Sequence, residues 1–267
     1  MPCCGRLVLY VAVLPHVVRC FLLGSCRARS PHQVLKTYKY YCSSINSAST
    51  AFDITTETRR ALSGRPPFIA VMRKVEVDDA VEMAAVAFDA GINMVTVTAD
   101  TPGYPRILRA MDEAASGLVL LGVSSVTTPE QVEEASAAGA RFVSTKELFR
   151  PVVRRAKELG LMSVTGVSTP SQAAEAVALG ADVLKVFPAT SVSPAAFGAI
   201  VASLPALVPV IIAGGVEIED LEAYFSAGAS GFAVGKTLFT PDSSLDDIKA
   251  KACMFVNEGS RWARPVR

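Results

Sequence analysis

Histidine is almost absent from this chain of 267 residues, and its two histidines, His16 and His32, both lie near the amino terminus. Cysteine is spread as unevenly, since Cys253 alone lies beyond the first 52 residues. The rest of the chain therefore lacks the residues for Ser-His-Asp or Cys-His catalysis, for a histidine or thiolate metal site, and for a disulfide framework. We predict no metal site.

Acidic side chains are missing from residues 1–52, because the first acid in the sequence is Asp53. The same stretch carries six arginines and lysines together with several serines, a composition typical of an organelle targeting sequence. Its apolar run Leu7–Leu14 is too short to cross a bilayer. We therefore predict a presequence for a plastid or a mitochondrion, and a mature protein that does not bind membranes. A disordered extension or a misassigned start is the alternative interpretation.

Charge is nearly balanced over the whole chain, with a net charge of +1 at pH 7 and no basic stripe beyond the first 52 residues. A nucleic-acid surface needs clustered lysine and arginine, so the sequence does not suggest nucleic acid as a partner. Small anionic molecules remain candidates, because one or two local cations are enough to bind them. Hydrophobic residues make up 51% of the chain, enough for the core of one large domain or two small ones.

Apolar runs alternate with stretches of helical spacing through residues 53–258. The predicted strands are Phe68–Met72, Met94–Ala99, Leu118–Val123, Arg141–Ser144, Met162–Val167, Val183–Phe187, Val208–Ala213 and Gly231–Val234. The predicted helices are Asp78–Asp89, Pro105–Ala115, Pro129–Ala138, Glu147–Leu159, Pro170–Leu179, Pro194–Leu204, Ile218–Ser226 and Ser244–Asn257, after a short one at Thr56–Ser63. Eight strand–helix units with short connections predict an α/β protein, a single (β/α)8 TIM barrel. An open doubly wound sheet is the alternative fold, and residues 259–267 are predicted to be a loosely packed tail.

The ends of several predicted helices carry recognisable signals. Thr128 and Thr169 each stand before a proline, which is the order of a hydroxyl cap followed by the first helical residue. Gly139 and Gly180 follow predicted helices and can close them in the left-handed conformation.

Lys185 lies inside a predicted strand that is otherwise apolar, Val183–Phe187. Because side chains alternate along a strand, Val183, Lys185 and Phe187 share one face. An amine enclosed in an apolar barrel loses hydration, which lowers its pKa toward the range in which it is a nucleophile. Two interpretations stay open here: a Schiff-base lysine that attacks a ketone, or a structural lysine that pairs with a carboxylate or reaches out of the barrel mouth.

Glycines follow the last two predicted strands. Gly214 and Gly215 end the seventh strand, and Gly235 ends the eighth, directly before Lys236. In such barrels, backbone amides after these two strands form the usual phosphate site. We therefore predict a phosphate site here, to which Lys236 adds a positive charge; glycines that merely turn the chain are the alternative.

These motifs together resemble one enzyme family. The segments Gly166–Pro170 and Gly180–Ala189, with Pro67–Arg73 and Ala213–Gly215, are similar to the 2-keto-3-deoxy-6-phosphogluconate (KDPG) aldolase family and to its branch acting on the galactonate epimer. The resemblance covers about residues 66–256. It implies a homotrimeric class I aldolase that cleaves a phosphorylated 2-keto-3-deoxy sugar acid to pyruvate and glyceraldehyde 3-phosphate. It also implies a Schiff base on lysine, without metal or cofactor.

The resemblance assigns roles to individual residues. It aligns Lys185 with the Schiff-base lysine and places Arg73 near the substrate carboxylate. Ser125 falls where a hydroxyl contacts the pyruvyl group, and Phe187 of the lysine motif is a further candidate for substrate contact. The glycines described above match the positions of the phosphate loop, with Lys236 where members often have serine.

The sequence departs from the family pattern at three positions. The glutamate that moves protons in the family is replaced by Thr96, and threonine is not a base near neutral pH. Asp100 stands where members often have arginine, and it is the first candidate to replace that base, acting through water from the barrel mouth; an ordinary loop aspartate is the alternative. Glu147, after the fourth predicted strand, is the second candidate, and a helix cap is its alternative role. Thr165 replaces a proline, and we count it with the substrate-binding candidates.

Three functions follow from these observations. The first is a working aldolase of this family, a carbon–carbon lyase. The second is a degenerate barrel that binds a phosphorylated metabolite without turning it over, because Thr96 replaces the general base. The third is a lysine-dependent enzyme with another electrophile, since imine chemistry also serves dehydration.

Overall fold

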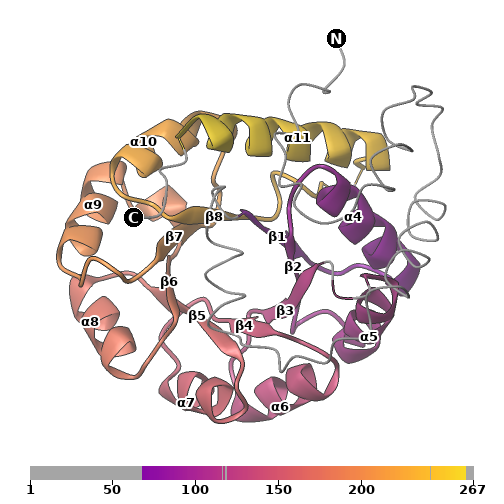
Figure 1. The fold of residues 1–267 in the computed structure, drawn as a ribbon, viewed down its shortest axis with the longest axis horizontal. Helices are drawn as coiled ribbons and strands as arrows, with labels where there is room; N and C mark the ends of the chain where they lie inside the picture. The colour runs from indigo at the N-terminus through magenta and orange to yellow at the C-terminus, as the bar shows by residue number, and fades with distance from the viewer. Residues whose placement is uncertain (1–67, 116, 118, 241, 263–267) are drawn as a thin grey trace, which may run out of the picture.

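The computed structural model describes residues 68–262 except 116, 118 and 241, and in this part of the chain eight parallel strands form one closed barrel. The strands are β1 (Phe68–Met72), β2 (Met94–Thr98), β3 (Leu120–Ser124), β4 (Phe142–Ser144), β5 (Met162–Val167), β6 (Val183–Val186), β7 (Val210–Ala213) and β8 (Gly231–Val234). Figure 1 shows them as an inner ring surrounded by an outer ring of helices. The prediction of a (β/α)8 barrel is confirmed.

One helix follows each strand in the chain. The helices are α4 (Val77–Asp89), α5 (Tyr104–Ala115), α6 (Pro129–Ala137), α7 (Arg150–Glu158), α8 (Pro170–Ala178), α9 (Pro194–Ala202), α10 (Leu221–Ser226) and α11 (Leu245–Trp262). Two short 3-10 turns, η1 (Ala189–Ser191) and η2 (Ile218–Asp220), precede α9 and α10. None of these helices in the described part of the chain has the length and hydropathy of a membrane span.

The sheet closes because the first and last strands pair. Phe68 lies opposite Phe232 and Ala70 opposite Val234, both in parallel register. Every other neighbouring pair of strands is also parallel and consecutive in the chain. The open doubly wound sheet is therefore wrong for this chain.

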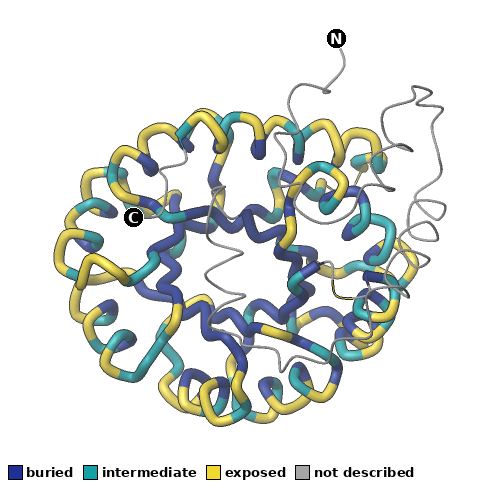
Figure 2. Tube along the Cα trace, viewed as in Figure 1, coloured by how far each residue is buried: buried dark blue, intermediate teal, exposed yellow. Residues whose placement is uncertain are grey.

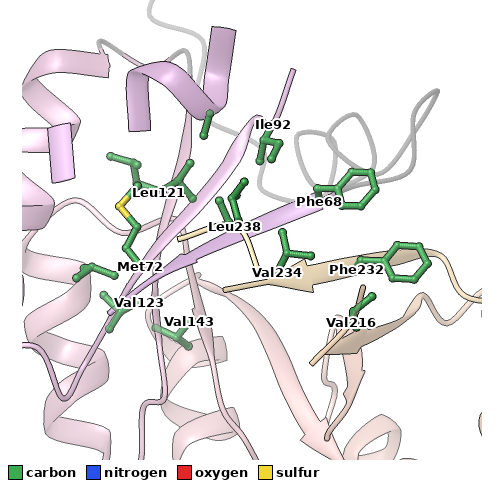
Figure 3. Close-up of a cluster of buried hydrophobic side chains, with 14 of the residues drawn as sticks. Phe68, Met72, Ile92, Leu121, Val123, Val143, Val216, Phe232, Val234 and Leu238 are labelled. Atoms are coloured by element: carbon green, nitrogen blue, oxygen red, sulfur yellow. The ribbon is translucent and has the colours of Figure 1, made fainter. Parts of the chain in front are cut away.

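The apolar residues form two layers, one on each face of the sheet. The larger cluster lies between strands and helices, where Figure 3 shows Met72, Val123 and Phe232 among its members. The smaller cluster fills the barrel with residues from most strands, including Met94 and Phe142. Figure 2 shows the strands as a ring in which most residues are buried. Side chains along each strand point alternately to these two faces, and this alternation decides which polar side chains enter the lumen.

The helix signals in the sequence are confirmed. Thr128 accepts a hydrogen bond from the backbone N–H of Gln131, and Thr169 accepts one from Gln172. These contacts satisfy one of the unpaired donors at each helix start.

Most predicted boundaries lie within three residues of the observed ones, two of the predicted helices differ in a further way, and the predicted helix Thr56–Ser63 lies outside the described residues. The last helix runs on to Trp262, whose indole N–H donates to Glu258. Residues 259–262 thus belong to α11 rather than to a tail, because Gly259 and Trp262 still find packing partners. The predicted helix Ile218–Ser226 is split, since the tighter η2 turn precedes α10.

Candidate active site in the barrel lumen

Lys185 lies inside the barrel, where strand alternation predicts it. It shares the inner face of β6 with Val183, and the residue is 6% exposed. Its Nζ donates a hydrogen bond to Oγ of Ser144, at 2.6 Å. Burial and, to a smaller extent, the positive charge of Lys146 together lower the pKa of Lys185 to about 7. Close to neutral pH, a large fraction of this amine is unprotonated and therefore nucleophilic.

The structural alternative for Lys185 required a carboxylate partner or an exposed amine. In the part of the chain that the structure describes, no carboxylate lies within salt-bridge distance of Nζ. The side chain is buried and does not reach out of the barrel mouth. The geometry therefore favours the reactive amine.

Gly166 makes room for the chain segment that follows β4. It lies on β5 directly beside Lys185, between the strands that carry Lys185 and Ser144. A Cβ at this position would overlap the carbonyl carbon and oxygen of Lys146. The chain after β4 thus passes over Gly166 on the inner face, which brings Lys146 close to the reactive amine.

Thr96 occupies the lumen position at which the sequence resemblance expects a glutamate. It is fully buried, and its hydroxyl accepts a hydrogen bond from Ser124, with 2.7 Å between the oxygens. Thr96 in turn donates to the backbone oxygen of Ala70, at 3.4 Å. This pair of hydroxyls is neutral and satisfied, so it does not supply a base.

Three predicted site residues meet at the barrel mouth. Arg73 follows β1 and forms an ion pair with Asp100, which follows β2. A second guanidinium nitrogen of Arg73 donates to Oγ of Ser125, at 3.4 Å. Ser125 has a positive φ of 59°, which is uncommon for a non-glycine residue and is frequent at functional sites.

The Asp100 carboxyl is held in its ionised form. Burial works to raise its pKa, whereas a hydrogen bond with the Thr98 side chain lowers it. The positive charges of Arg73 and Lys146 lower it further, and the net pKa lies below the ordinary value. A carboxylate with a lowered pKa is a weaker base, so this geometry favours a role in orienting Arg73 over a role as the missing general base.

Two glycines of the predicted phosphate site turn the chain after β7. Gly214 and Gly215 both have positive φ, of 92° and 79°. A Cβ on Gly214 would lie 2.7 Å from the ring of Phe187, so the absence of a side chain lets this ring pack against the turn. Gly235 ends β8 next to Lys236, which is exposed.

Glu217 adds an acid near the predicted phosphate site. Its carboxylate accepts a hydrogen bond from the hydroxyl of Thr237, at 3.2 Å, and caps η2. A negative charge at this corner opposes a phosphate dianion. Lys236 therefore has to offset Glu217 if these backbone amides are to bind phosphate.

Thr165 does not face the lumen. Thr165 lies opposite Leu184, which belongs to the outer cluster. Along β5, Val164 belongs to the inner cluster and Val167 to the outer one, so Thr165 shares the outer face with Val167. Its buried hydroxyl has no hydrogen-bond partner. Strand alternation thus places Thr165 against the helices, and the prediction that it contacts substrate does not fit this position.

Comparison with known proteins identifies the family. A family model described as KDPG and KHG aldolase matches residues 62–253. The chain belongs to this family. It is 30% identical over 190 residues to the 2-dehydro-3-deoxy-6-phosphogalactonate aldolase of Escherichia coli, covering 71% of this chain and 93% of that protein. The family consists of aldolases, and the chain is accordingly a carbon–carbon lyase of the class I aldolase kind.

Solved structures give the same result. A native KDPGal structure is 29% identical, with a TM-score of 0.71, covering 73% of this chain and 95% of the other. The fold is shared with the KDPG aldolase of Legionella pneumophila, at 21% identity and a TM-score of 0.63, covering 76% of this chain and 97% of that one. The latter structure holds pyruvate as a covalent carbinolamine intermediate.

Sequence reasoning missed two residues of this aldolase site, Ser144 and Lys146. Alternation along β4 could have predicted Ser144, because it puts Ser144 on the same inner face as Phe142. Nothing in the sequence pattern places Lys146 beside Lys185, since their proximity depends on the path of the chain over Gly166. No three histidine, cysteine, aspartate or glutamate residues gather as metal ligands within the described ranges.

Replacing Lys146 with alanine is expected to raise the pKa of Lys185, because it removes a positive charge that disfavours the ammonium form. Competitive acetylation of the folded protein across pH, read by peptide mass spectrometry, measures the pKa of Lys185 directly. In Lys146→Ala, the rise of the Lys185 acetylation rate with pH should move to higher pH. Lys157→Ala, which removes an exposed lysine from α7, is the matched control and should leave the curve in place. An unchanged curve for Lys146→Ala would remove Lys146 from the site.

Proposed function

We propose that this aldolase cleaves a phosphorylated 2-keto-3-deoxy sugar acid to pyruvate and glyceraldehyde 3-phosphate through a Schiff base on Lys185. The observation that carries the proposal is the buried amine of Lys185, with a pKa of about 7 and no carboxylate partner among the described residues. Trapping of pyruvate as a carbinolamine in a protein of the same fold supports this chemistry.

The proposed binding mode uses both ends of the site. Arg73 would bind the substrate carboxylate, oriented by Asp100, and Ser125 would contact the keto acid from the same side of the mouth. Phe187 would pack against the apolar carbon chain. The amides at Gly214, Gly215 and Gly235, together with the charge of Lys236, would hold the phosphate.

The chemistry follows from the electron demand of the imine. The amine of Lys185 attacks the keto carbon C2, and loss of water from the carbinolamine gives a protonated imine. Its nitrogen accepts the electrons of the C3–C4 bond as that bond breaks. The C4 hydroxyl gives up its proton to water and becomes the aldehyde, while the enamine left on the lysine takes a proton from water at C3 and is hydrolysed to pyruvate.

A binding-only barrel is the second candidate, and the position of Thr96 favours it. The hydroxyl pair formed by Thr96 and Ser124 replaces the base that the family pattern expects. General acid–base help is typically worth about 10²–10⁴-fold in rate. A barrel without such help would still bind the metabolite at Arg73 and the phosphate loop.

One experiment separates these candidates and tests both sugar epimers. Each phosphorylated 2-keto-3-deoxy acid, gluconate or galactonate, is incubated with the protein while pyruvate release and the melting temperature are followed. We expect pyruvate release from at least one epimer. A rise in melting temperature without pyruvate would instead establish binding without turnover, and products other than pyruvate would indicate another imine-dependent reaction.

The proposal extends to assembly and location. We propose a homotrimer, as the family resemblance implies. We also propose import into a plastid or mitochondrion through residues 1–52, which lie outside the described residues; their basic, acid-free composition is the support.

A further inference from the structure

Carbinolamine formation leaves a proton on nitrogen and a negative charge on oxygen, and a carrier has to exchange them. The family pattern assigns proton movement to a glutamate, but the lumen here holds Thr96 at that position. Its hydroxyl is bonded to Ser124 and to Ala70 rather than to Lys185. The carrier must therefore be another group beside Nζ.

Ser144 is in direct contact with the reacting nitrogen. It is the last residue of β4, faces inward with Phe142, and is 2% exposed. Its Oγ accepts the hydrogen bond from Nζ of Lys185, at 2.6 Å. Among the described residues, this is the hydrogen bond that holds the amine.

The hydroxyl of Ser144 keeps its own proton available. A serine hydroxyl is one donor and two acceptors, and here the described part of the chain shows it accepting from Lys185 and donating to no side chain or backbone oxygen. The carbinolamine oxygen is bonded to the carbon that Nζ attacks. A hydroxyl hydrogen-bonded to Nζ therefore lies within reach of that oxygen.

We propose that Ser144 is a further catalytic residue, which carries the proton from nitrogen to oxygen during carbinolamine formation. The amine attacks C2, the carbon–nitrogen bond forms, and the carbonyl electrons move onto oxygen. Ser144 then donates its hydroxyl proton to this oxygen and takes one proton from the positively charged nitrogen. The products are a neutral carbinolamine and an unchanged serine, so atoms and charge balance without an external base.

The relay suits a buried site that lacks a carboxylate. Serine is too weak an acid or base to hold a full charge near neutral pH, but a concerted exchange never requires one. The geometry is also fixed, because the hydrogen bond from Nζ of Lys185 to Oγ of Ser144 already spans β5. This inference rests on the proposed function at one step, the reaction of Lys185 with a keto acid.

The test follows the rate at which the full-length protein forms a borohydride-reducible adduct with pyruvate. Ser144→Ala is expected to slow adduct formation by roughly 10²-fold or more, while the adduct level reached at long times stays near that of the unchanged protein. A relay changes rates in both directions and leaves the equilibrium alone. A merely misplaced amine would lower the final level as well, and that result would overturn the proposal.

Two further variants complete the design. Ser144→Thr keeps a hydroxyl at this position and should restore the rate to within about tenfold, by the scale of proton-transfer help given above. Ser163→Ala is the matched control, because Ser163 is a buried serine on β5 whose hydroxyl bonds Asp182 on the outer face; it should react at the normal rate. Normal adduct formation by Ser144→Ala would overturn the relay. An adduct without sugar-acid cleavage would overturn the proposed substrate and leave the relay standing, whereas no adduct on the unchanged protein would overturn both.

Discussion

Lys185→Met is expected to reduce pyruvate release to background and, at pH 7, to make the protein more stable. The loss of activity follows because no other group would form the imine. The gain in stability follows because folding buries an amine whose pKa falls from 10.5 to about 7, at a cost of about 4 kcal/mol at pH 7. Methionine removes that cost. It also leaves the buried hydroxyl of Ser144 without a hydrogen-bond partner, which destabilises the protein by roughly 1–3 kcal/mol. We expect a net rise in the free energy of unfolding of about 2 kcal/mol.

The pH dependence fixes the sign of this effect. Between pH 7 and 10.5 the unfolded chain binds a proton on Lys185 that the folded chain does not. The stability of the unchanged protein should therefore rise with pH across this range relative to Lys185→Met. Chemical denaturation at a series of pH values measures the difference in the free energy of unfolding, which should fall as the pH rises and reverse sign before pH 10, once the cost of burying the amine is smaller than the loss at Ser144. A difference that stays constant from pH 6 to pH 10 would contradict a buried amine, and Lys157→Met should show none.

Gly166→Ala is expected to destabilise the barrel by about 3 kcal/mol or more, at the upper end of the cost of overpacking. The added methyl group would overlap the backbone of Lys146, which cannot turn aside as a side chain can. The clash also displaces the segment that carries Lys146, whose charge acts on Lys185. Thermal unfolding measures the loss, and adduct formation with pyruvate should fall with it.

A second glycine provides a control for this result. Gly198 lies within α9, and a Cβ there would come no closer than 3.5 Å to the carbonyl oxygen of Ala227. Gly198→Ala should stabilise the protein by roughly 0.5–1 kcal/mol, because alanine is the better helix former. If both variants unfold at the temperature of the unchanged protein, the chain does not pass over Gly166 as described.

The fold was predictable because local signals and global topology agree in this sequence. Most strands are apolar runs that end at a polar or glycine turn, and Thr128 and Thr169 mark helix starts that the structure confirms. The end of α11 was not predictable from periodicity. Its last turn is held by packing of Trp262 and by a bond to Glu258, which are contacts of the folded molecule.

The site was predictable where a single strand decides the outcome. Alternation along β6 alone places Lys185 in the lumen. Ser144 was missed because its contact with Lys185 crosses an intervening strand, β5. Thr165 was assigned from resemblance rather than from alternation, which would have placed it on the outer face.

The central claim is that Lys185 reacts with a keto acid, and trapping tests it most directly. The protein is incubated with pyruvate and borohydride, digested, and its peptides are analysed by mass spectrometry. We predict one reduced pyruvate adduct, on Lys185 and not on the nearby Lys146, with trapping strongest near and above pH 7. A folded protein that gives no adduct, or an adduct on Lys146 with Lys185 unmodified, would contradict the account.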